Sequence, residues 1–295
     1  MPAVAALAPF LFICLWSGAF IAVRAGLPDV SPLYFLSVRF AIAGSVLAVI
    51  VSLWQPRRWR ELRGRWALTA LAGVLMNGGY LSAAYLAMTE ITGATMALVG
   101  SLQPILVAVL SGPLLGERFG WPQWLGFALG TGGVALVAGV NVLQLDTGAG
   151  MAWGLGSVSC MVVGTLLFAR YAKGVPAAHA NALQLLAAAV FCSVLTLVFE
   201  DVRVVWTPAS VGTLLYLIFG VSLGGMGLYL YMLNRGAAGK VAANFYLTPG
   251  LTAVFGYGLL GETLPPTALA GFAMAMAGLW LVQGRAALAG RARRT

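Results

Sequence analysis

The chain has 295 residues, of which 61% are hydrophobic and only 8% are charged. Soluble domains carry roughly 25% charged residues, so this chain has too few charges to cover a water-facing surface. Its net charge of +9 would suggest nucleic-acid binding in a soluble protein, but no nucleic-acid partner is expected here. The composition predicts an all-α integral membrane protein.

The first apolar segment, residues 3–24, contains about 20 residues, which is enough to cross roughly 30 Å of hydrocarbon. Val23-Arg24-Ala25 weakly resembles a signal-peptide cleavage site, but the opening residues Met-Pro-Ala-Val-Ala-Ala contain no basic group. We therefore interpret this segment as the first membrane helix.

Apolar stretches of spanning length recur along the rest of the chain, and the connectors between them are too short to hold a soluble domain. Ten membrane helices are predicted, at residues 3–24, 32–54, 66–88, 94–115, 121–140, 151–171, 177–198, 209–233, 241–260 and 266–283.

The charges of the connectors predict the orientation of these helices. If the N-terminus is cytoplasmic, fourteen of the 17 Lys and Arg residues face the cytoplasm and most carboxylates face outward, as the positive-inside rule requires. We expect both termini to be cytoplasmic, in a bacterial inner (plasma) membrane. The fourteen residues are Arg57, Arg58, Arg60, Arg63, Arg65, Arg118, Arg170, Lys173, Arg235, Lys240, Arg285, Arg291, Arg293 and Arg294.

The two halves of the chain resemble each other when one is shifted by 145 residues. The shift aligns Pro104 with Pro249, Gly116-Glu117 with Gly261-Glu262, and Gly126-Phe127-Ala128 with Gly271-Phe272-Ala273. Residues 1–140 and 151–295 are thus predicted to be two five-helix repeats, joined near residues 141–150. Because five is odd, the second repeat enters the membrane inverted, and inverted repeats are typical of alternating-access transporters.

Each half also carries a proline in its fourth helix, then Leu-Leu-Gly-Glu, then a glycine-rich fifth helix. With Trp16-Ser17-Gly18-Ala19-Phe20 and Arg39-Phe40, these motifs resemble the drug/metabolite transporter superfamily (EamA type) over nearly the whole chain. Within it, the sequence is most similar to the YddG-type exporters of aromatic and other amino acids. The resemblance implies an amino-acid exporter.

Motifs for other chemistry are missing from the sequence. His179 is the only histidine, and the cysteines Cys14, Cys160 and Cys192 lie in apolar runs, so no metal ligand set is expected. All eight carboxylates lie at predicted helix ends or in loops, whereas proton-coupled transporters usually bury one. We expect no cofactor and no catalytic residue, and facilitated movement of a substrate in place of proton coupling.

Pro104 and Pro249 interrupt the predicted fourth and ninth helices at matching positions. Each proline is either a tolerated kink or a hinge about which half a helix swings. Its presence in both repeats favours a hinge.

Polar and aromatic residues near these prolines are the expected lining of a substrate site at the midplane. Tyr80 corresponds to Gly225 in the other half, which leaves room for a flat side chain on which Tyr80 and Trp16 stack. The alternatives are interhelical hydrogen bonds and ordinary core packing. The candidate substrate-binding residues are Trp16, Ser17, Asn77, Tyr80, Ser101, Gln103, Asn244, Tyr246 and Thr248.

Arg39 is the one cation predicted to lie deep in a span, where it either attracts a substrate carboxylate, holds helix-end carbonyls or extends to the surface. A carrier of nucleotide sugars or phosphorylated sugars would need more buried cations than this. A membrane-embedded enzyme or a receptor leaves the repeat unexplained. The leading hypothesis is therefore a monomeric exporter of amino acids, aromatic ones favoured, whose partners are its substrate and the lipid bilayer.

Overall fold

The computed structural model describes residues 2–26, 30–139 and 148–292. Helical segments occupy each of the ten predicted ranges, and the described residues form no strand, only an isolated bridge between Val30 and Val204. Residues 140–147, which hold most of the predicted junction between the halves, lie outside the described part of the chain.

Five predicted ranges are single unbroken α-helices. They are α1 (Pro2–Gly26), α2 (Pro32–Trp54), α7 (Trp121–Ala138), α9 (Ala177–Phe199) and α14 (Pro266–Ala292).

The other five ranges change helix type or break partway along. They are α3 (Trp66–Gly73), η2 (Val74–Gly79) and α4 (Tyr80–Met88); α5 (Gly93–Gly100) and α6 (Leu102–Leu115); α8 (Ala149–Leu167) and η4 (Phe168–Ala172); α10 (Pro208–Tyr216), η5 (Leu217–Gly225) and α11 (Met226–Arg235); and α12 (Ala238–Ala242), η6 (Ala243–Tyr246) and α13 (Leu247–Leu260). A short 3-10 helix, η1 (Pro56–Leu62), joins α2 to α3.

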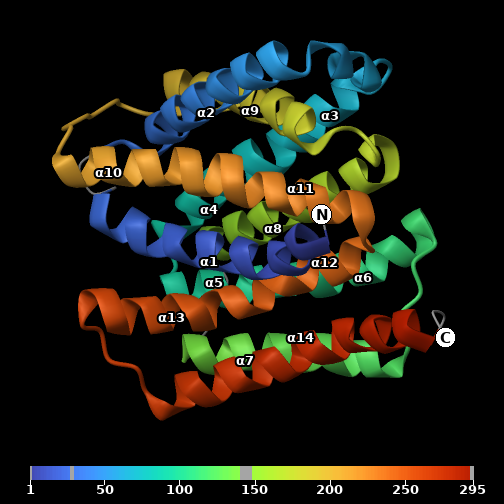
Figure 1. The fold of residues 1–295 in the computed structure, drawn as a ribbon. Coiled ribbons are helices and arrows are strands. Elements are labelled where there is room, and N and C mark those ends of the chain that lie inside the picture. The colour runs from blue at the N-terminus through green and yellow to red at the C-terminus, as the bar shows by residue number, and fades with distance from the viewer. Residues whose placement is uncertain (1, 27–29, 140–147, 293–295) are drawn as a thin grey trace.

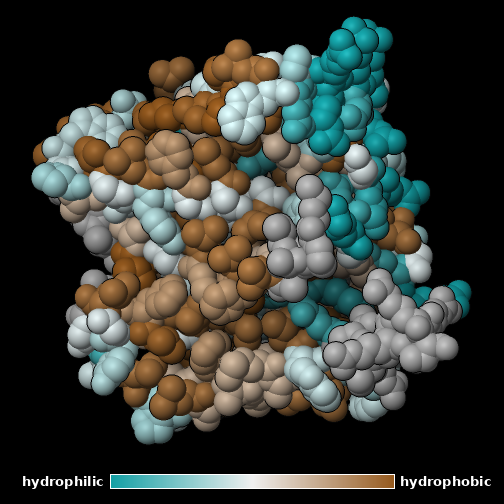
Figure 2. All heavy atoms as spheres, in the orientation of Figure 1, coloured by the Kyte–Doolittle hydropathy of each residue, from teal (hydrophilic) through white to brown (hydrophobic). Residues whose placement is uncertain are grey.

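Seven helical stretches among the described residues are long and apolar enough to cross a membrane, and Leu7–Val23 is a shorter apolar helix. Large apolar side chains also cover the outside of the bundle: Leu197 is 86% exposed and Leu53 is 74% exposed. Figure 2 shows hydrophobic atoms along the helices and hydrophilic atoms gathered at one end. This surface suits contact with lipid. The full count of ten crossings stays a prediction.

The helices form a stack in which two pairs lie on opposite sides (Figure 1). One pair is α2 with α9 and the other is α7 with α14, and the remaining helices lie between them. In each pair a helix packs on its counterpart from the other half of the chain.

Glycines let α7 and α14 approach closely. A Cβ added at Gly133 would lie 2.6 Å from the Gly271 carbonyl oxygen, and one added at Gly278 would lie 2.6 Å from the Gly126 carbonyl oxygen. These contacts are reciprocal, because Gly126 corresponds to Gly271 and Gly133 to Gly278 under the 145-residue shift. The small residues at Gly126, Gly133, Gly271 and Gly278 thus serve packing of α7 on α14 within the chain.

The first helix of each half packs among helices of the other half. Helix α1 contacts α10, η5, α11 and α13, and α8 contacts α3, η2, α4 and α6. The core of the molecule is therefore shared between the two halves.

One end of the bundle, which we name the basic end, carries Arg58, Arg65, Arg170, Lys173 and Arg235. Helix α1 begins and α14 ends toward it (Figure 1).

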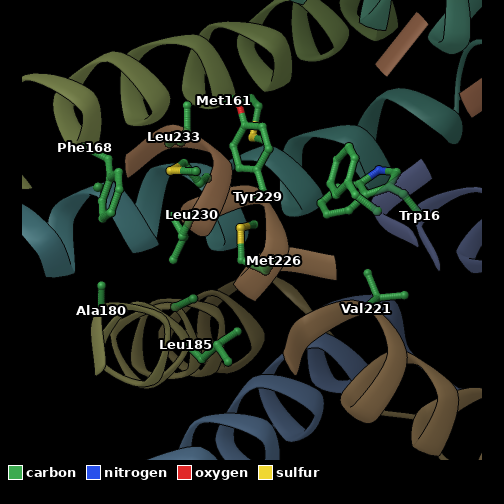
Figure 3. Close-up of a cluster of buried hydrophobic side chains, with 14 of the residues drawn as sticks. Trp16, Met161, Phe168, Ala180, Leu185, Val221, Met226, Tyr229, Leu230 and Leu233 are labelled. Carbon is green, nitrogen blue, oxygen red and sulfur yellow. The ribbon is translucent and has the colours of Figure 1, made fainter. Parts of the chain in front are cut away.

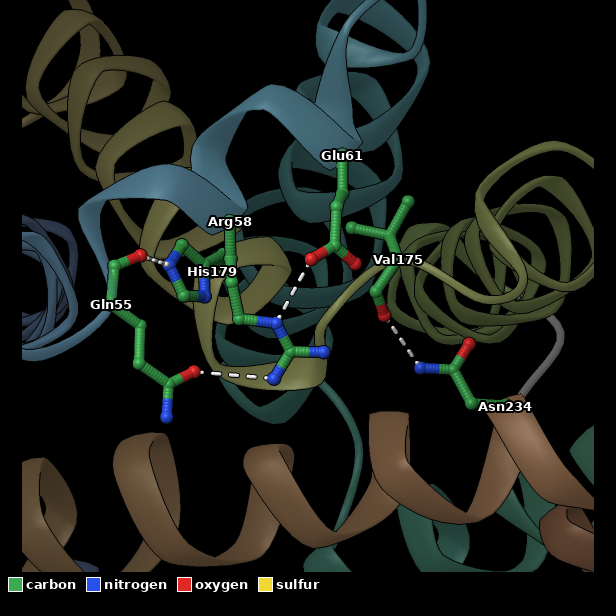
Figure 4. A network of polar contacts seen from close by, with 6 residues as sticks. All are labelled: Gln55, Arg58, Glu61, Val175, His179 and Asn234. Carbon is green, nitrogen blue, oxygen red and sulfur yellow. Dashed lines mark hydrogen bonds and ion pairs between the residues drawn. The ribbon is translucent and has the colours of Figure 1, made fainter.

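The connections at the basic end are held by polar contacts (Figure 4). Arg58 Nε donates to Glu61 at 3.0 Å, and Asn234 Nδ2 donates to the Val175 carbonyl at 2.8 Å. His179 Nε2, in the first turn of α9, hydrogen-bonds the Gln55 carbonyl at 3.1 Å.

At the opposite end the carboxylate of Glu200, which follows α9, accepts hydrogen bonds from the first turn of α2. The Leu33 N–H lies 3.0 Å and the Tyr34 N–H 2.7 Å from its oxygens. A carboxylate at a helix N-terminus satisfies free N–H groups and interacts favourably with the helix dipole. This contact joins the two halves at the end away from the basic residues.

Candidate functional site

Four of the predicted spans change conformation midway, at positions that correspond between the halves. The π-helical segment η2 matches residues 219–224 of η5, which is also π-helical. The turn at Ser101 between α5 and α6 matches Tyr246, the last residue of the 3-10 segment η6. Such interruptions leave backbone groups outside the regular helix ladder and are frequent at functional sites.

Pro104 and Pro249 lie directly after the breaks, each as the third residue of the new helix, α6 or α13. Proline has no N–H, so neither residue can bond the carbonyl four residues before it, and the hydrogen-bond ladder stays open across the break. The sequence predicts interruptions at the prolines themselves; in the structure the helix changes at Ser101 and over Ala243–Tyr246, at least three residues before each proline. The hinge itself stays a proposal.

An aromatic cluster occupies the space between these broken helices. It consists of Phe12, Trp16, Tyr229 and Phe245, with ring centroids 5.1–5.6 Å apart in five pairs. Trp16 is only 7% exposed (Figure 3). The rings come from α1, α11 and η6, so helices of both halves contribute to the cluster.

Tyr80 of α4 is partly buried and packs against the core that includes Trp16 and Tyr229. Tyr229 itself shares a hydrogen bond of 3.0 Å with the Thr165 hydroxyl. The room predicted over Gly225 is taken by Trp16, whose Cε3 would lie 3.6 Å from a Cβ there. Trp16 therefore lies against the bare backbone, with Tyr80 nearby.

Ser17, next to Trp16, ties α1 to α13. Its hydroxyl donates to the Thr248 carbonyl at 3.2 Å, and the Thr252 hydroxyl donates to the Ser17 carbonyl at 3.2 Å. The Thr248 hydroxyl is buried and has no partner. Ser17 and Thr248, both candidate lining residues, thus lie in contact, and the bonds they make are interhelical, which is the alternative that the sequence left open.

Ser101 and Tyr246, which correspond under the 145-residue shift, are joined through Thr131 of α7. The Thr131 hydroxyl lies 3.3 Å from both the Ser101 carbonyl and the Tyr246 phenol oxygen. The Tyr246 ring rests on Gly130, where an added Cβ would lie 2.4 Å from it. Both breaks are therefore braced against the same helix.

The remaining candidates make contacts of other kinds. Asn77 donates to the Gly73 carbonyl of its own helix at 3.3 Å. Asn244 accepts a 3.0 Å hydrogen bond from Gln283 of α14. Gln103 is 4% exposed, and its Nε2 has no hydrogen-bond partner.

Sequence reasoning missed several residues of this region. Phe12 lies four residues before Trp16 on the same helix face, and that spacing was a usable signal. Tyr229, Phe245 and Thr131 had no such signal, because their roles depend on how helices pack sideways.

A hollow of about 570 Å³ opens at the basic end, between the ends of α6, η4 and α11. Arg170, Lys173 and Arg235 line it. Arg170 donates to the Leu114 carbonyl, and Glu117 accepts from the Ala238 and Gly239 N–H groups at 2.6 and 3.2 Å. Glu117 therefore holds the beginning of α12. These contacts join the two halves at the basic end.

Comparison with known proteins identifies related chains. The model of the EamA-like transporter family matches residues 3–139 and 148–283. A protein of Archaeoglobus fulgidus named an uncharacterized transporter is 25% identical over 277 residues, which are 92% of this chain and 96% of that one. A probable terminal-alkyne amino-acid exporter of Streptantibioticus cattleyicolor is 27% identical over 288 residues, covering 93% and 92% of the two chains.

The fold also has a counterpart among solved structures. One crystal structure superimposes with a TM-score of 0.81 over 95% of this chain and 96% of its own, at 20% sequence identity. At that identity the similarity concerns the fold alone.

Proposed function

Because the chain belongs to the EamA-like transporter family, we propose that it exports amino acids, preferentially aromatic ones, by alternating access. Membership makes it a multi-pass membrane transporter, and its relatives carry transporter names. The inner membrane is the proposed location, with the basic end in the cytoplasm, since fourteen of 17 basic residues group on that side.

The observation that carries the substrate class is the aromatic cluster between the broken helices. Trp16 meets Phe245 edge-on and Phe12 at a tilt, at centroid distances of 5.2 and 5.4 Å, and the four rings form an apolar aromatic environment that suits another ring. The Tyr229 hydroxyl, which shares a hydrogen bond with Thr165, supplies a polar group there. The amino-acid exporter among the relatives agrees with this class.

We propose that the two halves, residues 1–140 and 151–295, rock about this cluster. Contacts between the halves exist at both ends: Glu117 with α12 and Arg170 with α6 at the basic end, and Glu200 with α2 at the other. Alternating access would break the contacts at one end of the bundle while those at the other end remain formed. Pro104 and Pro249 would let the half-helices swing.

The carboxylates support facilitated movement over proton coupling. No carboxylate of residues 30–139 or 148–283 is among the buried side chains, and Glu117 and Glu200 cap helix ends. A proton-coupled carrier usually needs an ionisable carboxylate within the membrane.

Binding of labelled L-phenylalanine to the purified protein tests the substrate class. We expect saturable binding that L-tryptophan displaces and that UDP-glucose and glucose 6-phosphate do not. Trp16→Leu should weaken it about tenfold through loss of a ring contact of roughly 1.4 kcal/mol. Trp280→Leu is the matched control, since Trp280 is 67% exposed on α14. Displacement by UDP-glucose or glucose 6-phosphate, without phenylalanine binding, would favour a sugar-phosphate carrier instead.

A further inference from the structure

Arg39 is a buried cation without a counterion. It lies in α2, is 5% exposed, and its Nε donates to the Ser222 hydroxyl at 2.9 Å. No carboxylate within the described ranges forms an ion pair with it; the ion pair found there joins Arg58 to Glu61. Removing a guanidinium from water costs several kcal/mol unless an anion or several hydrogen bonds compensate it. The position therefore favours an anionic ligand.

Unused hydrogen-bonding capacity lies next to Arg39. Asn181 of α9 donates from Nδ2 to the Ser222 carbonyl at 2.8 Å, and so contacts the same residue as Arg39. Asn181 is fully buried, yet its Oδ1 accepts no hydrogen bond. Buried polar atoms without partners are rare and costly in native proteins. Here a guanidinium and an amide with a free acceptor both contact Ser222.

The equivalent place in the other half of the chain carries no charge. Helices α2 and α9 have bounds 145 residues apart, so Arg39 corresponds to Gln184. Ser222 in turn corresponds to Asn77, and both lie in π-helical segments. Gln184 is fully buried against Gly73, and neither polar atom of its amide has a hydrogen-bond partner. A neutral side chain thus fills the same packing position, so the packing does not require the charge of Arg39.

Aromatic side chains also lie close to Arg39. Its Cζ is 5.2 Å from the centroid of the Phe40 ring, and Phe40 belongs to the same buried core as Trp16 and Tyr229. Tyr80 and Tyr85 of α4 pack against that core. A guanidinium and aromatic rings therefore occur in one buried region. This combination suits an aromatic amino acid, whose carboxylate and ring are only a few bonds apart.

We infer that Arg39 binds the carboxylate of the transported amino acid and that the free Oδ1 of Asn181 accepts a hydrogen bond from its ammonium group. The inference rests on the proposed amino-acid substrate. An Arg–carboxylate pair with two parallel hydrogen bonds is among the stronger polar contacts in proteins. Arg39 then sets the class of substrate: it must carry a carboxylate.

The test compares labelled L-phenylalanine with labelled phenethylamine, which lacks the carboxylate. The wild-type protein should bind phenylalanine more tightly. Arg39→Gln, which places at 39 the residue found at 184, should weaken phenylalanine binding about 10- to 100-fold and leave phenethylamine unchanged. Arg39→Lys should fall between the two, because it keeps the charge but loses the planar fork. Gln184→Leu is the matched control and should change neither ligand.

The outcomes separate the two proposals. If Arg39→Gln weakens both ligands equally, or neither, Arg39 does not bind the carboxylate, although the substrate class stands. If the wild-type protein binds neither ligand, the amino-acid substrate is wrong and this inference fails with it. Size-exclusion profiles establish that each variant folds. If Arg39→Gln does not fold, Arg39→Lys gives the same comparison of phenylalanine with phenethylamine.

Discussion

Replacing Gly133 with alanine should destabilise the protein by about 1–3 kcal/mol, the usual cost of overpacking a tight interface. The new Cβ would lie 2.6 Å from backbone atoms of both Gly271 and Ala275, and backbone cannot rotate away as a side chain can. The unfolding temperature in detergent should fall by about 5 °C.

Two further variants make this result specific. Gly278→Ala should cost about as much as Gly133→Ala, because its Cβ would meet Gly126 and Gly130 at the same 2.6 Å. Gly156→Ala in α8, where nothing lies within 4 Å, should leave stability unchanged or raise it slightly. Equal effects of Gly133→Ala, Gly278→Ala and Gly156→Ala would contradict the close α7–α14 contact. Unequal effects of Gly133→Ala and Gly278→Ala would contradict the matched contacts on the two helices.

Replacing Pro249 with alanine should slow transport while leaving the fold intact. Alanine restores an N–H that can extend the hydrogen-bond ladder across the break, so the half-helix would swing less freely. Transport should slow about tenfold, since about 1.4 kcal/mol added to the barrier suffices for that. The unfolding temperature should change little. Counterflow rates and thermal unfolding of the purified variant measure the two quantities.

Pro104→Ala should behave in the same way, because Pro104 occupies the corresponding position in α6. Pro113→Ala is the control: this proline also lies in α6, but away from the break, and is exposed. Wild-type transport in both Pro104→Ala and Pro249→Ala would remove the hinge from the mechanism and leave tolerated kinks.

The helical framework could be predicted from the sequence, but the form of its central helices could not. Hydropathy locates a span because it sums apolar residues along the chain, whatever the local helix type. The π-helical turns in 66–88 and 209–233 depend on neighbours: Gly78 lies against Phe191, and Gly224 lies against Leu15. The glycine pairs Gly78-Gly79 and Gly224-Gly225 were the available signal.

Only part of the candidate site could be predicted, because the sequence does not show how helices pack side by side. Of the residues that the sequence indicates as a lining, Trp16 is buried in the aromatic cluster and Ser17 hydrogen-bonds the Thr248 carbonyl, and their role in binding a substrate stays a prediction. The four-ring cluster was not foreseen, because Phe12, Tyr229 and Phe245 are ordinary apolar residues of their helices until α1, α11 and η6 pack together. Asn181 and Ser222 were likewise missed, because their interest depends on their contacts near Arg39. The 145-residue shift does not reveal those contacts.

Counterflow of labelled phenylalanine into liposomes containing the purified protein tests the central claim most directly. The liposomes are preloaded with unlabelled phenylalanine and assayed with and without a pH gradient. Facilitated transport of aromatic amino acids predicts uptake that L-tryptophan blocks and that is equal with and without the pH gradient. Uptake that requires the gradient would contradict facilitated movement, and no uptake in either condition would contradict the export of aromatic amino acids.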